Sequence, residues 1–170
     1  DSINLNDTVY ASIAGVGFDA LIAREFAKTQ ARGFQPYLKL VLQHYPHYQQ
    51  QNYTLVIDGK EITTQALFIS FANSKQFGFN TEIAPNAELN DGLIDIVIVK
   101  KPPLPLLFWT AQLLFFRKFD KSIYVETYQA KHVVVKNMDK MSINLDGEYV
   151  ELNGDLDFSI VPKSLKVIIP

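Results

Sequence analysis

The sequence has no cysteine, no long apolar run and no cluster of basic residues. The absence of cysteine excludes a disulfide scaffold and thiolate metal sites in these 170 residues, and it fits a cytoplasmic protein. No apolar stretch reaches the ~20 residues that a membrane-spanning helix needs. The basic residues are scattered, with no run longer than Lys100-Lys101, and the formal net charge is -2. This charge pattern argues against a nucleic-acid partner.

What is present is typical of a globular protein. Hydrophobic residues make up 48% of the chain and charged residues 20%, so we expect residues 1–170 to form a single domain with a core. No basic-then-apolar segment of a secretory signal opens the chain. Because the sequence starts at Asp1 without Met and is strand-like almost at once, we interpret it as part of a longer polypeptide.

Three helices are predicted. Apolar residues recur at helical spacing after Asp19, and Gly33 is the predicted end of this first helix. The second helix is predicted to open at Pro36 and to end or kink at Pro46. The third and most apolar helix is predicted over Leu106–Phe119. Apolarity on nearly all sides favours burial of this helix, and the alternative is a face directed at lipid or a partner.

Eight or nine strands are predicted around these helices, from segments rich in β-branched and aromatic residues. Strands dominate the second half of the chain without alternating helices. This order predicts a mainly β (α+β) fold, an antiparallel β-sandwich with about three inserted helices. The strand-like segments are 7–18, 53–74 (two strands joined at Asp58-Gly59), 93–100, 122–129, 132–137, 141–145, 148–152 and 156–170.

Three Asp-Gly pairs lie between or before strands. Asp58-Gly59 has the pattern of a plain hairpin turn. Asp146-Gly147 has the same pattern but is followed by Glu148, and two carboxylates on an extended strand could converge on a hydroxyl as a general base requires. If the chain turns tightly there, both carboxylates are solvated, and local pattern favours the turn.

The third pair closes a long loop without clear periodicity, residues 75–92. Its last part, Pro85–Gly92, gathers Asn86, Glu88, Asn90 and Asp91 before a buried strand. Carboxylate and carbonyl oxygens are the ligands of hard cations such as Mg²⁺. A polar turn with left-handed geometry is the alternative, and pattern alone favours it.

Two further features have mainly structural interpretations. The stretch Gly15–Ala20 resembles a phosphate-binding loop superficially, but it lacks the third glycine and the following βαβ unit. We expect its glycines to let a strand-to-helix bend pass close to another backbone, with Asp19 as a helix N-cap. The three histidines, His44, His47 and His132, lack the spacing of a zinc site.

Several stretches together resemble a known family. They are "AGVGFDA", "FANSKQFGFNTEIAPNAELNDGLIDIVIVK", "NLDGEYVE" and the closing "VPKSLKVIIP". In this order they are similar to the C-terminal domain of the diacylglycerol kinase and sphingosine kinase family, especially its bacterial lipid kinases. The most specific part is "APNAELNDGLIDI" combined with the later "NLDGE". Members of this family pair an N-terminal nucleotide-binding domain, with a Gly-Gly-Asp-Gly-Thr motif, with a C-terminal β-sandwich.

The resemblance implies roles for individual residues. Glu148 matches the proton acceptor of the family, and Asp146 matches the neighbouring acid that would orient the hydroxyl or assist with the metal. Asp91 matches a magnesium ligand, and the backbone carbonyls of Glu88 and Leu93 match the other protein ligands of that structural site. Many members have Asp at the position of Asn90, so the neutral amide lowers the negative charge of this loop.

The resemblance also implies the partners and the reaction. The full enzyme would transfer the γ-phosphoryl group of ATP to a lipid hydroxyl with Mg²⁺, and ATP would be bound mainly by the N-terminal domain, whose motif does not occur in this sequence. We therefore expect this chain to be inactive alone, and to meet a lipid substrate, the nucleotide-binding domain and transiently a membrane surface from the cytoplasm. A homodimer remains open. The rivals are a non-catalytic lipid- or partner-binding sandwich and a kinase of a soluble substrate such as a nicotinamide dinucleotide.

Overall fold

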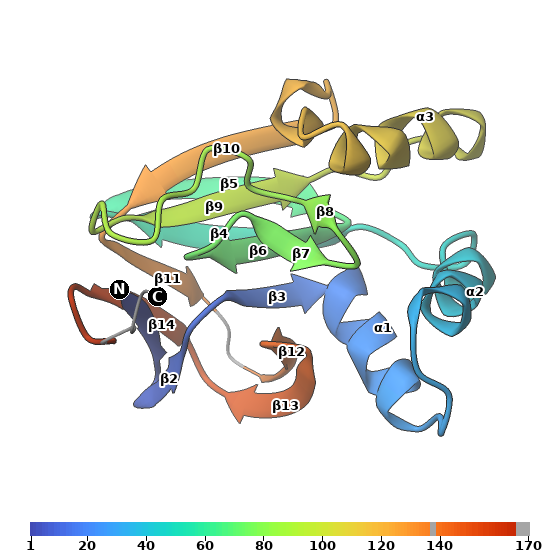
Figure 1. The fold of residues 1–170 in the computed structure, drawn as a ribbon. Helices are drawn as coiled ribbons and strands as arrows, with labels where there is room; N and C mark the ends of the chain where they lie inside the picture. Colours follow the sequence, from blue (N-terminus) through green and yellow to red (C-terminus); the bar gives the residue numbers. More distant parts are fainter. Residues whose placement is uncertain (137–138, 166–170) are drawn as a thin grey trace, which may run out of the picture.

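Two antiparallel sheets of six strands each pack face to face around the main core (Figure 1). The computed structural model describes residues 1–136 and 139–165. The predicted mainly β sandwich with inserted helices is therefore confirmed. The first sheet, sheet A, has the order β2-β1-β14-β11-β4-β5. Its strands are β1 (Ser2–Leu5), β2 (Thr8–Tyr10), β4 (Gln51–Ile57), β5 (Lys60–Ala66), β11 (His132–Lys136) and β14 (Leu156–Val161).

The second sheet, sheet B, carries the predicted site and has the order β10-β9-β6-β3-β12-β13. A separate two-stranded ribbon, β7 (Gln76–Gly78) and β8 (Thr81–Glu82), lies within the segment predicted as a long loop. The strands of sheet B are β3 (Ile13–Gly17), β6 (Phe68–Ala72), β9 (Ile94–Val99), β10 (Val125–Ala130), β12 (Lys140–Leu145) and β13 (Glu148–Asn153). The last residues of the predicted closing strand, 166–170, lie outside the described residues.

The core follows from the side-chain alternation of these strands. On β6, Ile69 and Phe71 are completely buried between the sheets, and Phe71 stacks on Phe158 of sheet A with ring centroids 4.0 Å apart. Strand β9 is buried on both faces, because a second apolar cluster that includes Val97 and Phe119 covers the outer face of sheet B. This double burial explains its nearly continuous apolar sequence.

The three α-helices lie together at the end of sheet B where β3 and β9 finish, on the right of Figure 1. They are α1 (Phe18–Ala27), α2 (Phe34–His44) and α3 (Leu104–Phe115), and a short 3-10 helix, η1 (Phe119–Lys121), follows α3. The predicted end of the first helix at Gly33 was wrong, because Gly33 instead precedes α2 as its N-cap residue. Among the described residues no helix is long and apolar enough to cross a bilayer.

The bend from β3 into α1 depends on glycine, as predicted. Gly17 has a φ of +85°, and a Cβ atom there would lie 2.8 Å from the carbonyl oxygen of Leu67. The prediction that Asp19 is the N-cap was wrong, since Gly17 occupies that position and Asp19 lies buried in the first turn of α1. The Asp19 carboxylate lies against Gly15 of β3 and Asn144 of β12.

The prediction that the most apolar helix is buried was also wrong. Within α3 only Thr110 is buried, and most of its large apolar side chains face solvent. One side of α3 packs on the protein through Leu107, Leu113 and Leu114. The remaining large apolar side chains of α3 are 43–65% exposed among the described residues.

Candidate functional site

The two predicted site segments meet at one end of sheet B. Antiparallel pairing places the start of β3 beside the end of β6, where Ile13 lies opposite Ala72. The start of β9 lies on the other side of the same strand end, where Asp95 is opposite Ala72. The end of β12 pairs with the start of β3 through Leu145 and Ala14. The loop before β9 and the turn after β12 therefore lie at the same end, opposite to the end that carries the helices.

The Asp146-Gly147 segment is a tight hairpin turn, as local pattern favoured. Both residues have positive φ, 48° and 93°, and the turn pairs Leu145 with Glu148. Positive φ at both central residues is the geometry of the two-residue turns that suit twisted hairpins. Glu148 is exposed at the first position of β13, so its carboxylate faces solvent at this end of the sheet.

The Asp146 carboxylate fastens the turn to the beginning of β3. It accepts hydrogen bonds from the backbone N–H groups of Ala11 at 2.9 Å, Ser12 at 3.0 Å and Ile13 at 2.8 Å. The N–H of Asp146 in turn donates to the carbonyl oxygen of Ile13 at 2.9 Å. Four bonds to one short segment hold the turn in place, which fixes the position from which Glu148 projects.

The Asp58-Gly59 turn repeats this arrangement in sheet A. The Asp58 carboxylate accepts the N–H groups of Lys131 at 3.1 Å and His132 at 2.9 Å, and the Asp58 N–H donates to the His132 carbonyl at 2.9 Å. The hairpin prediction is confirmed, and the aspartate adds a clamp that the pattern did not show. The two turns differ in the residue after glycine, which is Lys60 in one and Glu148 in the other.

A chain of polar contacts that ends at a buried carboxylate supports the Glu148 turn from the side of α1. The Gly147 N–H donates to Asn144 Oδ1 at 3.0 Å, and Asn144 Nδ2 donates to Asp19 Oδ2 at 2.9 Å. Asp19 is 3% exposed, and its Oδ1 has no hydrogen-bond partner among the described residues. Burial raises the pKa of Asp19 to about 6, although the bond from Asn144 opposes the shift. Gly15 makes room for this carboxylate, because a Cβ atom there would lie 2.0 Å from Asp19 Oδ2.

The raised pKa of Asp19 predicts a pH-dependent effect of the Asp19→Asn substitution. The folded state holds the proton from the ordinary pKa of 3.8 up to about 6, so wild-type stability decreases as pH rises through this window. Asn does not titrate. The free energy of unfolding of Asp19→Asn relative to wild type is therefore expected to rise by about 2 kcal/mol between pH 4 and pH 7. Denaturant unfolding at the two pH values measures this difference, and an equal difference at both would contradict the assignment.

Backbone and side-chain bonds connect the Glu148 turn to the loop before β9. The carbonyl oxygen of Ser12 accepts the Asn73 N–H at 2.9 Å, and Asn73 Nδ2 donates to the carbonyl oxygens of Ala11 at 2.8 Å and Asp1 at 3.0 Å. Asp1 Oδ2 then accepts the Gly92 N–H at 2.9 Å. Sequence reasoning missed both Asn73 and Asp1. An amide directly after a buried strand was the available signal for Asn73.

The predicted metal loop offers oxygen atoms but few carboxylates. Asp91 and Glu88 are exposed, and Asp91 Oδ1 accepts the Leu93 N–H at 3.0 Å. No group of three or more His, Cys, Asp or Glu side chains in the described residues is arranged for a metal ion. The predicted donor set is the Asp91 carboxylate with the backbone carbonyls of Glu88 and Leu93. Such hard oxygen ligands fit Mg²⁺, which usually keeps several waters.

A small polar pocket of about 220 Å³ lies beside this loop. Asp95 of β9 lines it and accepts a hydrogen bond from Gln129 Nε2 at 3.2 Å, while Asp95 Oδ2 is buried without a partner among the described residues. Burial raises the pKa of Asp95 to about 6. Asp120 and Asn86 also line the pocket. Sequence reasoning had placed Asp95 in a buried strand and assigned it no role.

Comparison with known proteins defines the class. Residues 12–169 match the family model of the YegS C-terminal NAD kinase beta sandwich-like domain. The match covers most of the chain, so the chain belongs to this family, and the resemblance to the bacterial lipid kinases is confirmed.

Individual relatives agree with this class. A diacylglycerol kinase of Mycobacterium tuberculosis is 26% identical over 163 residues, which cover 95% of this chain and 52% of that protein. A diacylglycerol kinase of Bacillus subtilis is 29% identical over 92 residues, which cover 54% of this chain and 30% of that protein. The chain thus spans about half the length, or less, of the curated relatives that it matches.

A solved structure shares the fold. A structure described as a diacylglycerol kinase from Bacillus anthracis str. Sterne superposes with a TM-score of 0.57 at 11% identity, covering 94% of this chain and 50% of that one. A second structure from the same organism has a TM-score of 0.67 at 15% identity, covering 95% and 52%. At these identities the likeness concerns the fold alone.

Proposed function

We propose that this chain is the substrate-binding and catalytic-base domain of an ATP-dependent lipid kinase, with Glu148 as the proton acceptor. The observation that carries the proposal is the placement of Glu148. It follows a turn clamped by four hydrogen bonds, and it lies at the same end of sheet B as the predicted metal loop. The family membership and the relatives named as diacylglycerol kinases support the reaction class.

The proposed chemistry is phosphoryl transfer to an alcohol. The Glu148 carboxylate accepts the proton of the lipid hydroxyl as its oxygen attacks the γ-phosphorus of ATP. The bond between the γ-phosphorus and the bridging oxygen breaks, and ADP leaves. A positioned base of this kind contributes about 10²–10⁴-fold to the rate. Asp146 acts as a positioning residue through its bonds to residues 11–13, and orientation of the hydroxyl by Asp146 remains part of the proposal.

Two ligands complete the proposal. Asp91, with the carbonyls of Glu88 and Leu93, would hold Mg²⁺, and a bound ion would fix the loop before β9. Because Asp1 bonds the Gly92 N–H and Asn73 bonds Asp1, a fixed loop would also steady the Glu148 turn. ATP would be bound mainly by a nucleotide-binding domain of the same polypeptide. We infer action at the cytoplasmic membrane surface, where the lipid substrate resides.

The proposed function is tested with labelled ATP and a panel of acceptors. The full-length natural polypeptide that carries these residues is incubated with diacylglycerol, a sphingoid base, a polyprenol and a soluble nicotinamide dinucleotide. We expect label in one of the lipids and none in the dinucleotide. Residues 1–170 alone are expected to give no product, because ATP binding is assigned elsewhere. Labelling of the dinucleotide alone, or turnover by residues 1–170, would overturn the proposal.

A second candidate function has one observation in its favour. The exposed apolar side of α3 is also what a non-catalytic lipid- or partner-binding module would present. Such a module does not need the Glu148 carboxylate, so Glu148→Gln would keep its binding activity. The wild type would phosphorylate none of the acceptors. The acceptor panel therefore separates this candidate from the kinase.

A further inference from the structure

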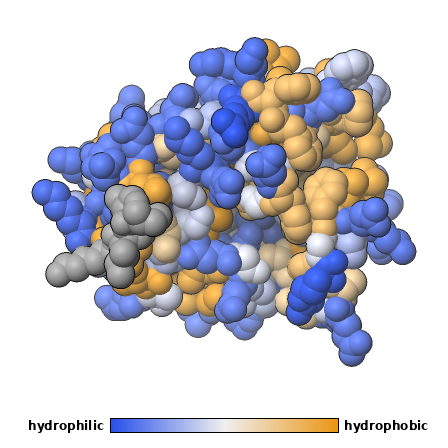
Figure 2. All heavy atoms as spheres, in the orientation of Figure 1, coloured by the Kyte–Doolittle hydropathy of each residue, from blue (hydrophilic) through white to orange (hydrophobic). Residues whose placement is uncertain are grey.

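Helix α3 and the segment after it expose a continuous apolar surface. In Figure 2 hydrophobic side chains gather at the upper right of the molecule, over the region of α3 in Figure 1. Phe108 is 64% exposed, Trp109 65%, Phe116 68% and Ile123 85%. We call this surface the α3 face, and it consists of Leu104, Leu106, Phe108, Trp109, Phe115, Phe116 and Ile123.

The α3 face is not needed to hold the helix in place. Leu107 packs on the cluster formed by α1 and α2, while Leu113 and Leu114 pack on the outer face of sheet B. The inner side of the helix thus packs on the protein, and its outer side faces solvent. Large aromatic side chains in water without a packing role mark an interaction surface.

Aromatic contacts and a groove extend the face on both sides. The Phe34 ring of α2 lies 6.2 Å from Phe115 and 5.5 Å from Phe79, measured between ring centroids. On the other side an open, mostly apolar groove of about 410 Å³ lies between α3 and Ile123. The apolar surface is therefore wider than one helix, so it can contact an extended apolar phase.

The charge around the face is positive. Residues 100–124 contain five Lys or Arg and one acid, Asp120, which gives 5 − 1 = +4. The net charge of the whole chain is -2, so the other 145 residues carry -2 − 4 = -6. The segment that holds α3 thus differs in sign from the remainder of the chain, and this asymmetry favours an anionic partner.

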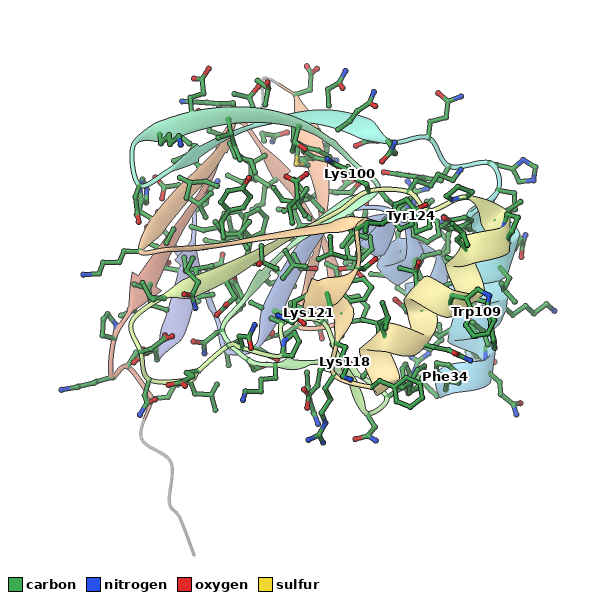
Figure 3. The ribbon with its side chains drawn as sticks, turned by 90° about the horizontal axis from the view of Figure 1, so that it is seen from above. Phe34, Lys100, Trp109, Lys118, Lys121 and Tyr124 are labelled. Carbon is green, nitrogen blue, oxygen red and sulfur yellow. The ribbon has the colours of Figure 1, made fainter. Side chains whose placement is uncertain are left out.

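Two of the cations, Arg117 and Lys121, point outward while their acidic partners are covered. Arg117 bonds Glu82 at 3.1 Å with side-chain exposures of 70% and 13%, and Lys121 bonds Asp120 at 2.7 Å with exposures of 74% and 8%. Figure 3 looks down on α3, with Trp109 on the helix and Lys118 and Lys121 beside its C-terminal end. Lys100 lies toward the other end and is paired with Glu126, whose side chain is 41% exposed. Basic side chains thus flank the apolar surface.

We propose that the α3 face docks on the surface of an anionic lipid bilayer. Trp, Phe and Leu enter the boundary between headgroups and acyl chains, and flanking Lys and Arg attract the anionic headgroups, as in interfacial helices. Two copies joined through this face would instead bring one +4 segment against another, which opposes a dimer there. The inference stands apart from the proposed reaction, because it rests on exposure and charge alone.

Vesicle flotation of the full-length polypeptide tests the docking. We expect binding to vesicles of phosphatidylcholine mixed with phosphatidylglycerol and much weaker binding to phosphatidylcholine alone. The double substitution Phe108→Ser with Trp109→Ser should lower the partition coefficient roughly tenfold to a hundredfold. Lys118→Gln should lower it about fivefold on the anionic vesicles only.

Matched controls come from sheet A. Val9 of β2 is 60% exposed, so Val9→Ser removes an equally exposed apolar side chain outside the α3 face and should leave vesicle binding unchanged. Lys60→Gln serves in the same way for the charge. Equal losses in the α3 and control variants would contradict a specific face and overturn the proposal.

The other occupants of the face give different results. Docking of a second copy predicts that the Phe108 and Trp109 substitutions change the sedimentation coefficient but not vesicle binding. If another part of the polypeptide covers the face, Trp109 fluorescence should be shielded from a soluble quencher and should not change when vesicles are added. The Trp109 signal is obtained as the difference between the wild type and Trp109→Phe. Either result overturns membrane docking. Neither depends on phosphorylation, so failure of the docking and failure of the kinase proposal are distinguishable.

Discussion

Replacing Glu148 with Gln is expected to lower the rate of lipid phosphorylation by about 10²–10⁴-fold. The side chain keeps its size and its exposed position at the start of β13, but an amide cannot take the proton of the attacking hydroxyl. Lipid binding should be retained, since the change leaves apolar surfaces intact. Turnover with labelled ATP and equilibrium binding of the same lipid to the full-length polypeptide measure the two effects.

Lys60→Gln is the matched control for this substitution. Lys60 occupies the same place after Asp58-Gly59 that Glu148 occupies after Asp146-Gly147, and both residues begin a strand in an exposed position. The control should keep wild-type turnover. If Glu148→Gln also retained full turnover, Glu148 would not be the base, and the non-catalytic alternative would gain support.

The substitution Asp146→Ala is expected to destabilise the protein by about 2–4 kcal/mol. It removes the acceptor of three backbone N–H groups at the beginning of β3, and charge-assisted bonds of this kind are stronger than neutral ones. Asp58→Ala should destabilise the protein too, by about 1–3 kcal/mol, because it removes the acceptor of two such groups. Denaturant unfolding of both variants measures the free energy of unfolding.

The two aspartate variants separate a structural role from a catalytic one. At a temperature where both remain folded, Asp146→Ala should lose turnover because Glu148 is no longer held, while Asp58→Ala should keep it. If Asp146→Ala lost stability but kept turnover, the role of Asp146 would be limited to holding the turn against residues 11–13. A loss of turnover without a loss of stability would show direct action on the substrate instead.

The clamps show why an acidic turn is difficult to interpret from its sequence. Asp58 and Asp146 look alike in sequence, and both fasten a hairpin to a neighbouring strand. Their partners are more than 70 residues away along the chain, so no local pattern contains them. The two turns differ chemically in the residue that follows glycine, Lys60 or Glu148. Whether that residue has a function depends on which other segments lie at the same end of the sheet.

The fold was largely predictable because strand alternation and turn residues are local signals. Strands β4 and β5 and the hairpin at Asp58-Gly59 follow from the period of two and from the turn chemistry. The predicted burial of the most apolar helix failed for a physical reason. Composition shows how apolar a segment is, but how much of it is buried depends on the surface of the protein on which it packs. Only one side of α3 packs on the protein.

The sequence by itself determined the antiparallel sandwich, the bend at Gly17 and the family, because each depends on residues close together in the chain or on the order of motifs along it. Only the tertiary structure decided which polar residues meet. It joined Asp146 to residues 11–13, connected that segment through Asn73 and Asp1 to the loop before β9, and buried Asp19 beside Asn144. Pairing of distant strands sets these neighbours, and that pairing follows from the packing of the whole chain.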